Sequence, residues 1–150
     1  MKKIILVLSI LMLTSLACSF TVNLPEMTVG ETKTLTIDEG LPTGTDPMRL
    51  TVEMGAGSLN INGGSDRLVS GSINYNVENW VPSVTRSGNN IDITQTRTGN
   101  LGTPNKKIIN KWDLSLGNYP FDMTINAGAY EGTLNLGGIP LTELRINDGA

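Results

Sequence analysis

The sequence of 150 residues contains no histidine and a single cysteine. Without histidine, the Ser-His-Asp and Cys-His arrangements of hydrolases cannot be built, and imidazole metal sites are excluded. A single cysteine also excludes a disulfide within the chain. Paired carboxylates are the main route to hydrolysis that remains.

Aromatic and charged residues are also scarce, at 5% and 17% of the chain. The chain has 11 Lys and Arg against 14 Asp and Glu, which gives a net charge of -3. After the first few residues the basic side chains are scattered, and Lys106-Lys107 is their only adjacent pair. Nucleic acid is therefore not an expected partner.

The N-terminus carries the pattern of a secretory signal. Lys2 and Lys3 precede an almost unbroken apolar run, Ile4 to Leu13, and the small residues Ser15 and Ala17 follow. The run is shorter than the roughly 20 residues that cross a bilayer. The pattern predicts a signal helix within residues 1–17 that is removed on export, and an uncleaved anchor is the alternative.

Cys18 follows the small residues directly. Ser15-Leu16-Ala17-Cys18 resembles the bacterial lipobox, in which a diacylglyceryl group is attached to the cysteine thiol, although that pattern prefers Leu where this chain has Ser15. We therefore predict lipidation at Cys18, and an ordinary signal with a cysteine near the cut is the alternative. A thioether lipid with an acylated amino terminus would hold the protein on the membrane, at the extracytoplasmic face of the envelope.

Residues 18–46 are expected to form a lead-in, or tether, with one strand. In Glu31 to Ile37, Lys33, Leu35 and Ile37 alternate with threonines, as in a half-buried or edge strand. Turn residues follow in 38–44.

From residue 47 the sequence repeats itself. Residues 47–56 match 120–129 at an offset of 73, and a third copy, 141–150, follows the second at an offset of 21. Residues 57–64 also resemble 132–138, so the second copy is expected to carry two extra residues, Tyr130 and Glu131, at its corner.

Each copy is predicted to be two short strands joined at a Gly-Ala corner. A coil of about 21 residues cannot bury its apolar face alone, so coils must stack. The predicted fold is all-β, a β-solenoid of single-stranded, β-helix-like coils over 47–150, and two similar hairpins in a sandwich are the alternative. One continuous core is expected from Leu50, Val52, Leu59, Ile61, Met123, Ile125, Leu134 and Leu136.

The region from Leu68 to Ile109 interrupts the repeat. It predicts a strand over 68–77, a hairpin around Ser87-Gly88-Asn89 and an exposed loop over 97–107. Residues 112–116 then predict a strand that leads into the second copy.

These segments together resemble the toast-rack family of bacterial envelope proteins, which is similar to the LiaF-like and putative-adhesin domains. The resemblance covers about residues 49–150 and is carried by 50–61, Tyr75-Asn76, Pro82, 112–116 and 123–136. It implies a parallel β-solenoid at the envelope. It implies little chemistry, and the LiaF-like members, which sense envelope stress, usually carry transmembrane helices that this chain lacks.

No catalytic, cofactor or metal site is expected. The carboxylates fall mostly at outward strand positions or in turns: Asp92, Asp113, Asp122, Glu131, Glu143 and Asp148. Gly63 to Leu68 resembles one calcium-binding nonapeptide, but a turn is the better interpretation of a single copy. Trp80 and Tyr130 are candidate surface contacts, although packing is favoured for Trp80.

Two functions follow. The first is a non-enzymatic lipoprotein that presents a β-solenoid surface to envelope proteins or glycans, in a structural, adhesive or stress-sensing role. The alternative is a carbohydrate-binding module that holds wall or extracellular polysaccharide through aromatic residues. An exposed aromatic row would favour the second, and a flat Asn/Thr face the first.

The fold is not expected to be complete at Ala150. The third copy stops at its Gly-Ala corner, which leaves Leu144 and Ile146 without a covering neighbour. We expect either further coils in a longer protein or a partner chain over this end.

Overall fold

The computed structural model describes residues 26–96, 103–104 and 107–149. The predictions of a signal in 1–17, of lipidation at Cys18 and of most of the loop over 97–107 lie outside these residues. The described residues form strands without a helix, which confirms the all-β prediction. The strands are β1 Glu26–Met27, β2 Val29–Glu39, β3 Met48–Met54, β4 Gly57–Ser65, β5 Val69–Val77, β6 Pro82–Ser87, β7 Asn90–Gln95, β8 Thr103–Pro104, β9 Asn110–Gly117, β10 Phe121–Ala127, β11 Tyr130–Asn135 and β12 Leu141–Asp148.

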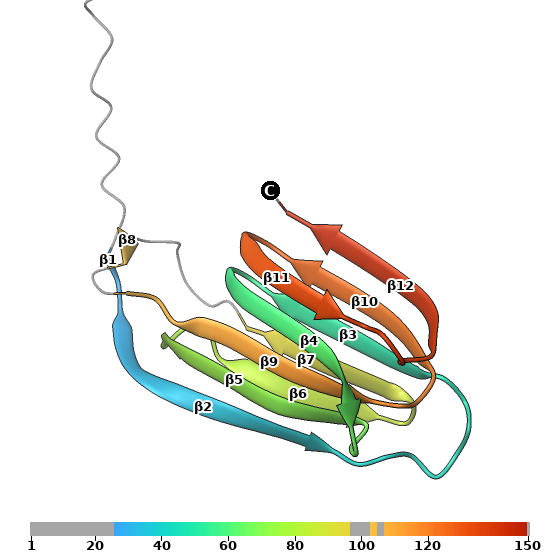
Figure 1. The fold of residues 1–150 in the computed structure, drawn as a ribbon. Coiled ribbons are helices and arrows are strands. Elements are labelled where there is room, and N and C mark those ends of the chain that lie inside the picture. Colours follow the sequence, from blue (N-terminus) through green and yellow to red (C-terminus); the bar gives the residue numbers. More distant parts are fainter. Residues whose placement is uncertain (1–25, 97–102, 105–106, 150) are drawn as a thin grey trace, which may run out of the picture.

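Ten of the strands build two five-stranded sheets that pack face to face (Figure 1). The first sheet has the order β12-β10-β3-β7-β6, and the second has the order β11-β4-β9-β5-β2. In both sheets the repeat-derived strands pair in parallel, while β2, β5 and β6 pair in antiparallel fashion at one end. We call each pair of strands that lies at one level of the two sheets a rung. The rungs are β7/β9, β3/β4 and β10/β11, and β12 begins a fourth.

The register confirms the sequence repeat. β10 pairs with β3 at an offset of 73, with Met123 beside Leu50 and Ile125 beside Val52. β12 pairs with β10 at an offset of 21 from Asp122 onward. Equivalent residues of the repeat therefore stack directly on one another, because alternate apolar positions on neighbouring rungs must meet to bury their surface.

One expectation about the repeat is wrong. Tyr130 pairs with Gly57 and Leu134 with Ile61, also at an offset of 73, so the second copy has no two-residue insertion at its corner. In the region that interrupts the repeat, β7 pairs with β3, and the following strand β9 pairs with β4. These two strands supply the rung beneath β3 and β4.

The core lies between the two sheets. Six of the predicted core residues are fully buried, and Leu134 and Leu136 are half-buried against them. Trp112 is fully buried too, and its Nε1 donates to Asn110 Oδ1 at 2.9 Å. The predicted strands over Glu31 to Ile37, 68–77 and 112–116 and the 88–89 hairpin are all present, with β2 as an edge strand.

Polar side chains fix the corner between β3 and β4. Asn110 Nδ2 donates to the carbonyl oxygen of Ala56 at 2.6 Å, and Gly55 N donates to Gln95 Oε1 at 2.9 Å. Gly57 has a φ of 144°, and a Cβ there would lie 2.1 Å from the Asn110 carbonyl oxygen. The close approach of β9 therefore requires glycine at this position.

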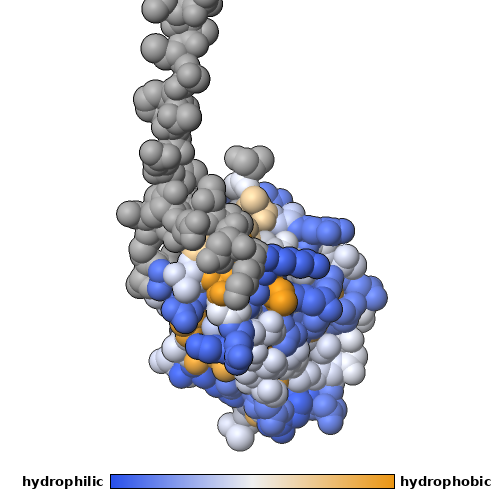
Figure 2. Space-filling model, turned by 90° about the vertical axis from the view of Figure 1, so that its left-hand side faces the viewer, coloured by the Kyte–Doolittle hydropathy of each residue, from blue (hydrophilic) through white to orange (hydrophobic). Residues whose placement is uncertain are grey.

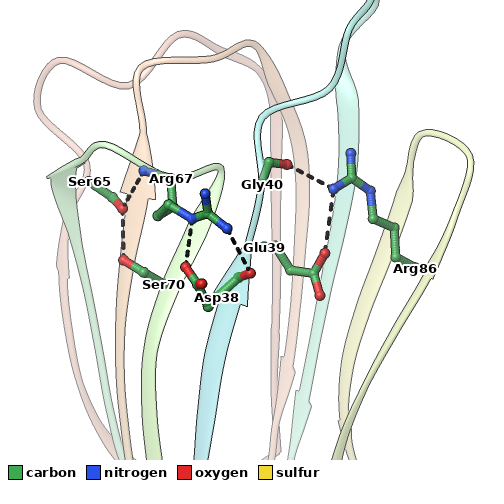
Figure 3. A network of polar contacts seen from close by, with 7 residues as sticks. All are labelled: Asp38, Glu39, Gly40, Ser65, Arg67, Ser70 and Arg86. Carbon is green, nitrogen blue, oxygen red and sulfur yellow. Dashed lines mark hydrogen bonds and ion pairs between the residues drawn. The ribbon is translucent and has the colours of Figure 1, made fainter.

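The strands β2 and β6 lie at one end of the stack, and two arginines form polar contacts there (Figure 3). Arg67 Nε pairs with Asp38 Oδ1 at 2.6 Å, and Arg86 Nη1 donates to the Gly40 carbonyl oxygen at 2.8 Å and pairs with Glu39 at 3.4 Å. Because Arg86 lies on β6 and Glu39 ends β2, the edge strands of the two sheets are joined here. We call this group the arginine clasp.

Candidate functional site

The outward side chains of the second sheet form three polar rows across all five strands. They alternate with buried residues such as Leu59 and Trp112, and the strand register places each row in line. We call these rows the polar face. The rows are Glu131-Ser58-Lys111-Asn74-Thr34, Thr133-Asn60-Asp113-Ser72-Thr36 and Asn135-Asn62-Ser115-Ser70-Asp38.

Side chains within the polar face form hydrogen bonds and an ion pair with one another. Asn60 Nδ2 donates to Asp113 Oδ1 at 2.7 Å, Lys111 Nζ pairs with Asp113 Oδ2 at 2.9 Å, and Thr34 Oγ1 donates to Asn74 Oδ1 at 2.7 Å. Burial raises the pKa of Asp113, but the hydrogen bond from Asn60 and the Lys111 ammonium together lower it below its usual value. The result is a polar surface in which these five side chains are held by contacts across neighbouring strands, a group that we call the bonded lattice of the polar face.

The outward face of the first sheet carries more charge. Asp122 pairs with Arg49 at 3.4 Å and with Arg145 at 3.2 Å, and Arg145 also pairs with Glu143. A second ladder runs from Asn147 to Asn126 to Glu53, at 2.8 and 3.3 Å. Arg49 with Asp122 and Asn126 with Glu53 lie at the offset of 73, and Asn147 with Asn126 lies at the offset of 21, so these contacts join equivalent positions of neighbouring rungs. Arg145 also joins β12 to β10 through Asp122. Each contact adds a modest amount to the stacking of the rungs because it is exposed.

Trp80 is buried, with 9% of its surface exposed. It packs with Val29 and Val77 in a second small cluster. Its backbone N–H donates to the Val77 carbonyl oxygen at 3.0 Å, and its backbone carbonyl oxygen accepts from Gln95 Nε2 at 3.4 Å. The residue thus packs against the start of β2, where Val29 lies, and is almost wholly shielded from solvent.

Tyr130 is half-buried at the start of β11. A Cβ on Gly132 would lie 2.5 Å from its ring, so the ring covers the position that Leu59 fills on the neighbouring strand. Its hydroxyl donates to Asp148 Oδ1 at 3.0 Å. Burial, with the carboxylate of Asp148, raises the pKa of Tyr130.

An open hollow of 680 Å³ lies beside Trp80, where the corner of β3 and β4 meets the segment that enters β9. Its charged lining residues are Lys107, Lys111 and Glu131. Figure 2 shows the side of the molecule where these corners lie; it is mainly hydrophilic, with hydrophobic areas confined to small patches.

Aromatic residues do not form an exposed row in the described part of the chain. Trp80, Trp112 and Phe121 are buried, and the three tyrosines are partly buried against the core. Tyr119, for example, donates its hydroxyl to the carbonyl oxygens of Gly44 and Asp46, at 2.8 and 3.1 Å. The surfaces that would stack on sugar rings are thus turned inward.

Four of the candidate carboxylates have polar partners of their own. Asp113, Asp122 and Glu143 are in ion pairs, and Asp148 accepts from Tyr130. Over the described ranges no three Asp, Glu or Cys side chains gather closely enough to hold a metal ion. At the calcium-like segment, Ser65 Oγ contacts Ser70 Oγ at 2.7 Å and accepts from Arg67 N at 3.1 Å, in a turn between β4 and β5 (Figure 3).

The polar network around Asn110 is the feature that sequence reasoning missed. Asn76 and Asn110 are the buried polar residues of the described chain, and the Asn76 amide accepts from Ile109 N at 2.7 Å and donates to the Lys107 carbonyl oxygen at 2.9 Å. Together they fix the segment that enters β9. The sequence offers one signal for this network, which is that both asparagines lie beside the strand of Trp112. A buried amide must find hydrogen-bond partners, so asparagines at such positions indicate a polar network.

The part of the chain that the structure describes contains no helix long and apolar enough to cross a membrane.

The family model described as the N-terminal domain of toast_rack, DUF2154, matches residues 11–150. No curated protein matches the sequence. Among solved structures, the chain is similar to a "putative cell adhesion protein" from Clostridium sporogenes ATCC 15579, with 23% identity, a TM-score of 0.65, and coverage of 79% of this chain and 57% of that one. A "putative adhesin" from Parabacteroides merdae ATCC 43184 also matches, with 15% identity, a TM-score of 0.37, and coverage of 85% and 56%. The chain thus spans little more than half of the length of these two proteins.

Proposed function

Since the chain belongs to the family of toast-rack N-terminal domains, we propose that it is a non-enzymatic envelope lipoprotein whose β-solenoid presents the polar face for adhesion to other envelope components. The rungs form the solenoid, and β2, β5 and β6 close one end of it. The signal within residues 1–17 exports the chain, and a lipid on Cys18 holds it on the membrane.

The observation that carries this proposal is the bonded lattice of the polar face. Its rows are mainly Ser, Thr and Asn, with the carboxylates of Glu131, Asp113 and Asp38 and one cation, Lys111. Contacts such as Asn60 to Asp113 hold side chains of its central strands in place. A surface that is already ordered loses little side-chain entropy when it binds, so weak contacts repeated over many positions can add up. The printed descriptions of the two similar structures, which concern adhesion, agree with such a role.

The proposal is tested with two charge-matched double variants. Thr36→Arg with Asn62→Arg changes exposed positions of the polar face, and Thr85→Arg with Asn90→Arg changes exposed positions of the first sheet. Binding of each protein to membrane extract and to deproteinised wall glycan is measured. We expect the first variant to bind envelope material at least about tenfold more weakly than the wild type, since two large charged side chains would obstruct the polar face, and the second to bind as the wild type does.

Wild-type protein that binds neither material, or equal weakening by both variants, contradicts the proposal. The two materials also separate the candidate functions. Binding to glycan alone, lost on Trp80→Ala but kept in the polar-face variant, would favour the carbohydrate-binding module, with the hollow beside Trp80 as its site.

A further inference from the structure

The polar face differs in composition from a surface that binds proteins. Its three rows consist of Ser, Thr and Asn, apart from Lys111 and the three carboxylates. Protein–protein interfaces are enriched in aromatic residues, Met and Arg, whereas Ser and acidic residues are depleted there. The rows, all of whose residues the structure describes, contain none of the enriched types. The composition therefore favours a ligand that is itself a dense array of hydrogen-bonding groups.

The charges of the polar face do not suit a strongly ionic ligand. Lys111 is the one cation of the described rows, and its ammonium pairs with Asp113 at 2.9 Å. Asp38 pairs with Arg67 of the arginine clasp at 2.6 Å. A polyanion is held by clustered Lys and Arg, and a polycation needs clustered carboxylates, but the three carboxylates lie in different rows on different strands. An uncharged polymer is the class of ligand that fits.

The polar groups recur at a regular spacing, because each row runs across the five strands of one sheet (Figure 1). Neighbouring strands lie about 4.8 Å apart, so a row is roughly 19 Å long. Hydroxyl and amide side chains each offer donors and acceptors, as the hydroxyl groups of sugars do. A polysaccharide also presents its hydroxyl groups at a regular repeat. One chain laid along a row can therefore make similar weak contacts on strand after strand, which add up.

Asp113 supplies a strong acceptor at the middle of the central row. Its Oδ1 accepts from Asn60 and its Oδ2 pairs with Lys111. A carboxylate has about four acceptor sites, so both oxygens can also accept from a ligand hydroxyl. The side chain is 38% exposed, which leaves it within reach of a ligand. Because hydrogen bonds to a charged acceptor are roughly twice as strong as neutral ones, a hydroxyl group is held most firmly at this position.

We infer that the polar face binds an uncharged polysaccharide, whose chain lies across the strands along the rows and whose hydroxyl groups bond to the Ser, Thr and Asn side chains and to Asp113. The inference rests on the proposed adhesive role of the polar face and names the partner of that face. It places the ligand on the outward surface of the second sheet and not in the hollow beside Trp80, so binding needs no aromatic stacking.

Binding of the full chain, purified in detergent, is measured against three fractions of its own envelope. These are neutral polysaccharide, which passes through an anion exchanger, acidic polysaccharide, which is retained, and membrane protein. We expect the neutral fraction to bind, and its affinity to change little over a roughly tenfold rise in salt, because few counterions are released. Fragments of that polysaccharide should compete more strongly as they lengthen, up to the roughly 19 Å of one row, where the gain levels off.

Two matched double variants locate the site. Thr36→Val with Thr133→Val removes the hydroxyl groups at both ends of the central row, without added charge and with β-branched side chains kept. Thr85→Val with Thr124→Val makes the same change at outward positions of the first sheet. We expect the first variant to bind the neutral polysaccharide about tenfold more weakly than the wild type, at about threefold for each hydroxyl group. The second should bind as the wild type does.

Binding only to the acidic fraction, an affinity that falls steeply with salt, or equal binding of the two Val variants overturns the inference. Binding only to membrane protein overturns it too, and in that case the adhesive role of the polar face still stands if Thr36→Arg with Asn62→Arg weakens that binding. A chain that binds none of the three fractions contradicts both the inference and the proposed function.

Discussion

At the scale of single residues, stability rests on the side chains that rungs bury against each other. Leu59 is fully buried beside Trp112 in the second sheet. We expect Leu59→Ala to lower the free energy of unfolding by about 2–5 kcal/mol, because the change removes contacts and leaves a cavity. Denaturant unfolding measures this, with Leu41→Ala as the exposed control at under about 0.5 kcal/mol. Equal effects of the two changes would contradict the packing described.

The ionisation of Asp113 makes the stability of the fold depend on pH. The Asn60 hydrogen bond and Lys111 hold its pKa below the usual value despite the opposing effect of burial. A lowered pKa in the folded state gives stability that is present above the pKa of the unfolded chain, about 3.9, and that is lost as the pH falls through the folded value. We expect Asp113→Asn to flatten this loss below about pH 4. Unfolding midpoints between about pH 2 and 7 measure it, and an unchanged profile would contradict the assignment.

At the scale of elements, the alternation of apolar and polar residues was enough to predict most strands. Leu50 and Val52, or Met123 and Ile125, repeat every two residues, and the period of a strand is also two. The repeat also predicted which strands become neighbours, since β3, β10 and β12 match at offsets of 73 and 21. The local alternation therefore predicted the strands, and the repeat predicted which of them pair.

The prediction failed where the local pattern is compatible with more than one strand register. Shifting β11 by two residues keeps every apolar residue on its face, so matching Leu134 to Leu59 looked as good as the observed pairing with Ile61. The ring of Tyr130 over Gly132 replaces a core side chain, and no periodicity signals that. The order of the rungs depends on pairing between β7 and β3, which share no repeat motif.

The candidate site was predicted only in part. A flat Asn/Thr face was one of two anticipated outcomes, and its rows arise wherever polar residues alternate with the core. The partners within it, such as Asp113 with Asn60, join strands 53 residues apart in the chain. Such contacts depend on the tertiary register and cannot be obtained from local sequence.

The corner between β3 and β4 leads to a prediction about the stability cost of replacing a glycine between two closely packed strands. A Cβ at Gly57 would meet the Asn110 carbonyl oxygen at 2.1 Å, whereas one at Gly64, which also has a positive φ, would meet nothing within 4 Å. We expect Gly64→Ala to cost about 1–2 kcal/mol from backbone strain alone, and Gly57→Ala to cost clearly more because β4 and β9 must separate. Thermal unfolding of the two variants gives the difference, and equal costs would show that the approach of β9 is unimportant.

At the scale of the whole molecule, the proposed lipid on Cys18 would limit how far the domain can lie from the membrane. The first described strand starts at Glu26, eight residues after Cys18. An extended chain spans at most about 3.5 Å per residue, so a lipid on Cys18 would keep the start of β1 within about 28 Å of the membrane surface. The polar face would then act close to the membrane.

This anchoring is tested by Cys18→Ser in the full chain. If the thiol carries the lipid, we expect the variant to lose membrane retention, because without it no acyl chains hold the protein. Partitioning between detergent and aqueous phases, with the apparent mass of each form, measures the loss. Ser15→Leu is the matched control: it brings the segment closer to the lipobox pattern and should remain in the detergent phase. Equal partitioning of Cys18→Ser and the wild type would rule out the lipid anchor, while the proposed role of the polar face would stand or fall on its own binding measurement.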